Sequence, residues 1–174
     1  MTLNNLSALD DADGRIEESL ATSRRVLAIW EKHYDPAHPN LGIVHNNIGE
    51  KLRRLGRFDE AFVHYDRALA ILEKALDADH PAVSMVRSNQ GLLHFARADL
   101  TRAAATLTRA LEGCDRKACD PSVVGEASFA LARCVWPRDP ARARGLAARA
   151  REAYAKRPGP ALDEVTAWLA DKTP

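Results

Sequence analysis

Three asparagines recur along the sequence at intervals of 42 residues: Asn5, Asn47 and Asn89. An asparagine side chain offers two N–H donors and one carbonyl acceptor, so it can hold the backbone of an extended peptide without selecting a particular side chain. Amides at a fixed spacing therefore indicate a polar ladder that binds a partner segment. The alternative is that these asparagines bridge adjacent helices and bind nothing.

Residues beside the asparagines would give such a ladder its selectivity. Arg53 and Arg54 can clamp a carboxylate with two parallel hydrogen bonds, and Met85, Leu92 and Phe95 can form an apolar pocket. We expect the partner to be a protein or peptide segment. The predicted groove consists of Asn5, Asn46, Asn47, Glu50, Arg53, Arg54, Met85, Ser88, Asn89, Leu92 and Phe95.

No catalytic constellation accompanies this predicted groove. The sequence has no glycine-rich phosphate loop, no His-Glu-x-x-His, no Gly-x-Ser-x-Gly and none of the protein-kinase motifs. The three cysteines, Cys114, Cys119 and Cys134, lack the paired two-residue spacing of zinc sites. We therefore expect no enzyme activity, no cofactor and no metal, and we interpret the cysteines as small core residues.

Composition limits the class of protein. The chain has 174 residues, 46% hydrophobic and 28% charged, with a formal net charge of +1. These values are typical of a globular protein and argue against bulk attraction to nucleic acid or lipid. The sequence has no apolar run long enough to span a membrane, and its first ten residues form no signal-peptide core. A cytoplasmic location is the simplest expectation.

One stretch, residues 133–157, is locally basic, with eight basic and two acidic side chains and a charge of +6. It could dock an acidic protein or a nucleic acid. Only Trp136 and Tyr154 lie among these arginines, and both have expected core roles, so base stacking is not indicated. We interpret the stretch as a solvated helix face and expect no nucleic-acid partner.

The 42-residue interval extends well beyond the asparagines. Gly14-Arg15 recurs as Gly56-Arg57, and His38-Pro39 recurs as His80-Pro81, which predicts a structural role for the two histidines. Each period has the pattern of two helices, for example about 40–55 and 58–76, with Gly56-Arg57 as the turn. The second run places apolar residues three and four apart, and strand signals are absent. The aspartates at 77 and 79 are expected to cap the next helix.

This period resembles the tetratricopeptide repeat, in its 42-residue variety found in kinesin light chains. The residues that carry the likeness are Ile48-Gly49, Leu52, Ala61, Tyr65 and Ala68, with Asn46-Asn47 and the Asp-x-x-His-Pro linker as marks of the longer variety. The resemblance implies an all-α protein, a right-handed α-α superhelix of about four helical hairpins plus a C-terminal capping helix. It also implies a protein-interaction module that binds extended segments through an asparagine-rich concave face.

The expected organisation is a single array over 1–174. Its repeats are placed at about 1–37, 38–79, 80–120 and 121–157, and its capping helix at 160–172. The third copy has Gln90 and His94 where the second has Ile48 and Leu52. We therefore expect its first helix to pack less well or to shift its register.

The two ends of the chain suggest different contexts. The first copy aligns from the middle of a helix, which suggests the C-terminal piece of a longer protein, or alternatively a degenerate first repeat. An uncovered first repeat would favour self-association. The last repeat and capping helix are similar to the tails of arrays that follow bacterial serine/threonine protein kinase domains. That likeness implies, as an alternative function, a regulatory or recruitment region of a bacterial signalling protein.

Overall fold

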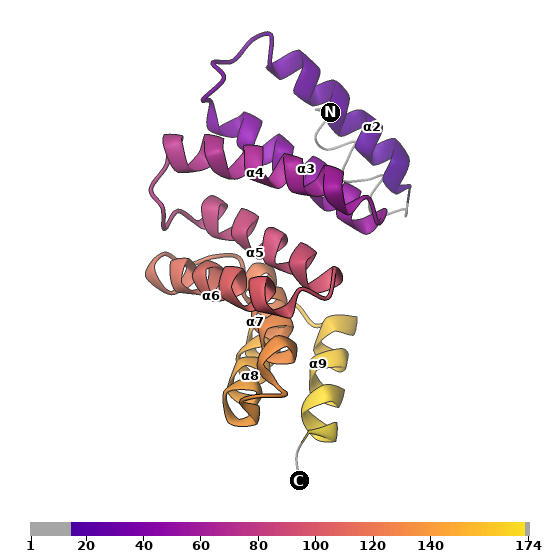
Figure 1. Ribbon diagram of the computed structural model, residues 1–174, viewed down its shortest axis with the longest axis vertical. Helices are drawn as coiled ribbons and strands as arrows, with labels where there is room; N and C mark the ends of the chain where they lie inside the picture. The colour runs from indigo at the N-terminus through magenta and orange to yellow at the C-terminus, as the bar shows by residue number, and fades with distance from the viewer. Residues whose placement is uncertain (1–14, 173–174) are drawn as a thin grey trace. The chain divides into compact units, whose positions relative to one another are not determined.

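The computed structural model describes residues 15–172, and every regular element in that range is an α-helix (Figure 1). The all-α fold predicted from the sequence is thereby confirmed. The chain divides into two compact units, Met1–Ala78 and Asp79–Pro174. The helices are α2 (Ile16–Trp30), α3 (Pro39–Arg54), α4 (Phe58–Ala75), α5 (Pro81–Ala96), α6 (Leu100–Arg116), α7 (Pro121–Val135), α8 (Pro140–Ala155) and α9 (Pro160–Asp171).

Proline and histidine together define where two of the helices start. Pro39 and Pro81 occupy the first turns of α3 and α5, where no N–H donor is needed. Before them, the His38 ring accepts a hydrogen bond at Nδ1 from the Asn40 N–H (3.2 Å), and His80 accepts one from the Ala82 N–H (3.1 Å). The histidines are therefore helix caps. The expectation that aspartate caps α5 is wrong, because His80 occupies the N-cap position.

Unit 1 contains α2, α3 and α4, with α3 packed against both neighbours (Figure 1). The apolar residues predicted at three- and four-residue spacing in the run 58–76 lie on α4, and Ala61, Tyr65, Ala68 and Leu72 among them are buried. Gly49 lets α3 approach α4 closely, because a Cβ placed there would lie 2.7 Å from Tyr65 Cε1. The close contact between the α3 backbone and the Tyr65 ring therefore requires glycine at position 49.

Unit 2 contains the α5–α6 and α7–α8 hairpins and the single helix α9. Gly91 repeats the close approach, since its Cβ would lie 2.7 Å from the Leu107 side chain. α9 packs on α8 as the expected cap, with Val165 buried and Trp168 against Phe129 at 5.9 Å between ring centroids. The capping helix predicted at 160–172 is thus present as α9.

The helix of the third copy does not shift its register. α5 has the same length as α3, 16 residues, and carries its glycine at the corresponding place. Gln90 and His94 are half-buried, while Val86 and Leu93 are buried in the core. Leu93 therefore fills the core of this repeat, although Gln90 and His94 are polar where the second copy has Ile48 and Leu52.

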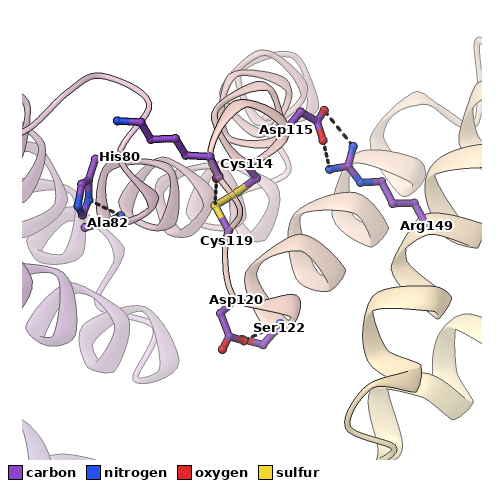
Figure 2. Close-up of a disulfide and its surroundings, with 9 residues drawn as sticks. His80, Ala82, Cys114, Asp115, Cys119, Asp120, Ser122 and Arg149 are labelled. Carbon is purple, nitrogen blue, oxygen red and sulfur yellow. Dashed lines mark hydrogen bonds and ion pairs between the residues drawn. A yellow bond between two sulfur atoms is a disulfide. The ribbon is translucent and has the colours of Figure 1, made fainter.

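A disulfide joins Cys114 in the last turn of α6 to Cys119 in the connection to α7 (Figure 2). Cys114 is buried in the core as expected, but Cys119 is half-exposed, and the sequence analysis did not expect a disulfide between them. The helix ends at Arg116 and the chain becomes extended at Lys117, which brings the two Cα atoms to 5.1 Å. Cys134 is a buried free thiol, and burial raises its pKa to about 11.

Candidate functional site

The part of the predicted groove in unit 1 lies on α3. Asn47, Glu50 and Arg54 are three and four residues apart, so they share one helix face. Asn47 and Glu50 are half-exposed and Arg54 is exposed. The face therefore presents an amide, a carboxylate and a guanidinium within two helical turns.

The corresponding part in unit 2 lies on α5. Met85, Asn89 and Leu92 share one face by the same spacing and are half-exposed. Phe95 continues this face, and the Arg133 guanidinium of α7 lies 4.9 Å from its ring centroid. Arg133 also lies 3.8 Å from a carboxylate oxygen of Glu164 on α9. This surface is apolar with one amide, and a cation lies at its edge.

Asn47 and Asn89 occupy equivalent places, each eight residues after the proline that starts its helix. In α7 the residue at this distance from the first proline is Phe129. Its side chain is only 7% exposed and packs against Trp168 of α9. The capping helix therefore covers the α7 position that corresponds to the asparagines.

Comparison with known proteins identifies the family. A family model of the tetratricopeptide repeat matches residues 1–65 and again 43–116. The chain belongs to the tetratricopeptide repeat family.

Solved structures share the fold of this tetratricopeptide chain. The kinesin light chain nearly identical TPR-like repeats of Podosopora anserina align with a TM-score of 0.75 and 19% identity, covering 98% of this chain and 83% of that one. BtubC (BKLC) from P. vanneervenii aligns with a TM-score of 0.68 and 20% identity, covering 99% of this chain and 65% of that one. At these identities the likeness shows the fold alone. No curated protein sequence matches, and the resemblance to kinase tails stays a prediction.

Not every residue of the predicted groove faces outward in the tetratricopeptide helices. Asn46 and Ser88 are 2% exposed, so neither side chain offers surface to a partner. The reason is that α3 packs against α2 and α4, while α5 packs against α6 and α7. Packing against two neighbours leaves only a narrow exposed strip on α3 and on α5. Asn5 and the start of the first repeat, where self-association was expected, lie outside the described residues.

Arg53 is a second case in which the structure refines the prediction. It is half-buried, and its Nε is buried with no hydrogen-bond partner in the described part of the chain. A buried donor without a partner carries a desolvation cost. Arg53 thus reaches inward more than Arg54, which is exposed. Of the two arginines, Arg54 is the more exposed, and its contact with a partner carboxylate stays a prediction.

The basic stretch 133–157 is partly neutralised within the repeats. Arg149 forms two contacts with the Asp115 carboxylate, at 2.6 and 3.3 Å (Figure 2). Arg144 donates a hydrogen bond to the Lys172 carbonyl at 3.4 Å, and Arg133 faces Glu164. These contacts favour the interpretation as a solvated helix face. Exclusion of a nucleic-acid partner stays a prediction.

A histidine pair in unit 1 was missed by the sequence analysis. His45 of α3 and His64 of α4 bring their Nδ1 atoms to 2.9 Å. Burial lowers the pKa of each imidazole to about 4, so both are neutral at pH 7. No cluster of three or more histidine, cysteine or acidic side chains able to hold a metal occurs in residues 15–172. None of the helices in this range is long and apolar enough to cross a membrane.

Proposed function

We propose that this chain is a non-catalytic module that binds extended partner segments, with the solvent-exposed face of α3 in unit 1 and that of α5 in unit 2 as its two binding surfaces. The tetratricopeptide fold supports a protein–protein interaction module in general. The observation that carries the finer proposal is the matched pair of half-exposed amides, Asn47 and Asn89. Each is placed eight residues after a proline start, and the Asn47 Oδ1 also accepts a hydrogen bond at 3.5 Å from Asn46.

Each amide can bind a peptide backbone by donating to a carbonyl and accepting from an N–H. Such hydrogen bonds contribute about 1 kcal/mol each. Neighbouring side chains give the two faces different preferences. Arg54 favours an acidic residue, while Met85, Leu92 and Phe95 favour an apolar one. A segment bound on α3 is therefore expected to carry a carboxylate, and a segment bound on α5 is expected to carry an apolar side chain.

The test begins by selecting binders of the full chain from a random peptide library. Affinities of the selected peptides are then measured by fluorescence anisotropy for the parent chain and for the Asn47→Ala/Asn89→Ala variant. We expect the double variant to bind about tenfold more weakly, which corresponds to the loss of one to two hydrogen bonds. Its helical circular dichroism and melting temperature should be unchanged, because both side chains are half-exposed.

The matched control is Asn40→Ala, which removes an exposed amide from the first turn of the same helix α3. This variant should bind the selected peptides as the parent does. Equal affinity of the double variant and the parent would contradict the groove proposal. In that case the asparagines would be structural, as in the alternative drawn from the sequence.

A further inference from the structure

A cavity of about 430 Å³ opens in unit 1, among the chain that follows α2 and the helices α3 and α4. Four apolar residues line it, and so do buried His45 and two oppositely charged side chains. The lining residues are Glu31, Pro36, Leu41, His45, Arg67, Ala70 and Ile71. Its volume falls within the range of about 300 to 1,000 Å³ that is typical of ligand pockets.

Arg67 places at this cavity a guanidinium without an ion-pair partner in the described part of the chain. The residue is exposed and forms no ion pair with any other residue between 15 and 172. Glu31 lines the same cavity without pairing with it. A single guanidinium at the edge of an apolar cavity can bind a carboxylate through two parallel hydrogen bonds.

The histidine pair lies beside this cavity and responds to the positive charge of Arg67. Because the two Nδ1 atoms are 2.9 Å apart, one ring donates to the other, and the pair remains neutral at pH 7. Burial is the main cause of the low His45 pKa, and the charge of Arg67 lowers this pKa further. The charge of Arg24 of α2 also lowers the His64 pKa. Only Glu60, already paired with Arg57 and Arg24, opposes this effect at His64.

We propose that the cavity binds the carboxylate of an apolar chain, with the carboxylate on Arg67 and the chain between Leu41 and Ile71. The apolar walls require a hydrophobic body, and the single guanidinium matches a single negative charge. Glu31 at the same cavity disfavours a dianion such as a phosphate monoester. At about 30 Å³ per water-sized group, the cavity admits roughly eight to ten carbon-sized groups with room for solvent at its mouth.

This site is distinct from the proposed groove, since it shares no residue with it. The ligand chemistry could come from a free medium-chain acid or from the C-terminal residue of a peptide. Both sources offer a carboxylate next to an apolar group. The experiment therefore includes one probe of each kind.

The test is a titration of the full chain with octanoate. Binding is monitored by isothermal titration calorimetry and by NMR of the imidazole protons. We expect saturable binding at millimolar concentrations or below. Octan-1-ol, which has the same chain without the charge, should bind about tenfold more weakly. A hexapeptide that ends in leucine, and its C-terminal amide, form the second arm. Tighter binding of the acid peptide than of octanoate would identify a chain terminus as the source, and the reverse would identify a free acid.

Two substitutions locate the binding. Arg67→Gln removes the charge at an exposed position and should weaken octanoate binding about tenfold. Ala70→Phe fills the cavity from an exposed helix position while it keeps every charge, and it should abolish binding. Arg25→Gln, an exposed position of α2 outside the cavity, is the charge-matched control and should bind as the parent does.

The histidines report whether the carboxylate sits where proposed. A bound anion offsets the charge of Arg67, so octanoate should raise the His45 pKa from about 4 by about one unit. Equal binding of octanoate by the parent and Arg67→Gln would overturn the proposal, as would equal binding of octanol and octanoate. Binding by the Asn47→Ala/Asn89→Ala variant should be unchanged, so this test succeeds or fails independently of the groove.

Discussion

The α3–α4 and α5–α6 hairpins have the same framework around different interiors. Both start with a histidine cap and a proline, and both place a glycine against the partner helix. Inside, Tyr65 of one hairpin corresponds to Leu107 of the other, and His45 and His64 correspond to Arg87 and Thr106. The 42-residue period therefore preserves backbone contacts and caps. The polar side chains inside the hairpins, such as His45 and His64, are not preserved between these two copies.

Acid should expose the largest difference between these hairpins. Unfolded imidazoles bind protons near pH 6.5, whereas those of His45 and His64 resist protonation down to a pKa of about 4. Between these values the unfolded state holds more protons, so stability falls as the pH decreases. We expect a loss of about 3 kcal/mol for each of the two imidazoles across this window, measured by urea unfolding at several pH values.

The control for this acid effect is the His45→Gln/His64→Gln variant, which lacks both titrating groups of the pair. Its stability should change far less between pH 6.5 and pH 4. A variant with the same steep loss as the parent would show that other groups cause the acid sensitivity.

Filling the glycine contacts tests the shared framework. Gly49→Ala and Gly91→Ala each place a methyl group within 2.7 Å of a buried side chain. Overpacking of this kind should lower the free energy of unfolding by about 2–3 kcal/mol in both hairpins. Gly145→Ala in α8 meets nothing within 4 Å, so it should instead stabilise the helix by about 0.5–1 kcal/mol. Chemical denaturation of the three variants measures these effects. Tolerance at Gly49 and a loss at Gly91 would show that the two interfaces differ.

The disulfide distinguishes the α5–α6 hairpin from the α3–α4 hairpin. Closing the short loop between Cys114 and Cys119, which are five residues apart, should stabilise the fold by about 2 kcal/mol. Reduction, or Cys114→Ser/Cys119→Ser, should therefore lower the melting temperature by several degrees. Calorimetry with and without a phosphine reductant measures the change. The melting temperature of the Cys114→Ser/Cys119→Ser/Cys134→Ser variant should not change when the reductant is added. An unchanged melting temperature of the parent protein under the same reductant would contradict a stabilising role of the disulfide.

The sequence predicted the helical hairpins well because a period requires every copy to satisfy the same packing. Ala61, Tyr65 and Ala68 are buried as their spacing indicated, and so are Ala103 and Leu107 one period later. The structure adds what depends on contacts across a hairpin or a turn. His45 and His64 are 19 residues apart and meet only when α3 folds against α4.

The predicted groove was less accurate at single positions. Its polar pattern placed Asn47 and Asn89 correctly at half-exposed positions, but it also included buried Asn46 and Ser88. A helical wheel assigns a face by angle and does not show how many neighbours a helix has. Burial on two sides therefore could not be inferred from α3 or α5 alone. That these faces bind a partner stays a prediction.

The smallest expected effect concerns the caps that the two hairpins share. His38→Ala and His80→Ala each remove one acceptor for a first-turn N–H, so each should cost about 1 kcal/mol. His38→Asn and His80→Asn should recover most of this loss, because an asparagine side chain can accept the same hydrogen bond. Urea unfolding of the four variants gives the comparison. Two alanine variants as stable as the parent would mean that water replaces the imidazole at no cost. A loss in the alanine variants that asparagine does not recover would point instead to ring packing, such as the stacking of His38 on Tyr34 at 4.2 Å between ring centroids.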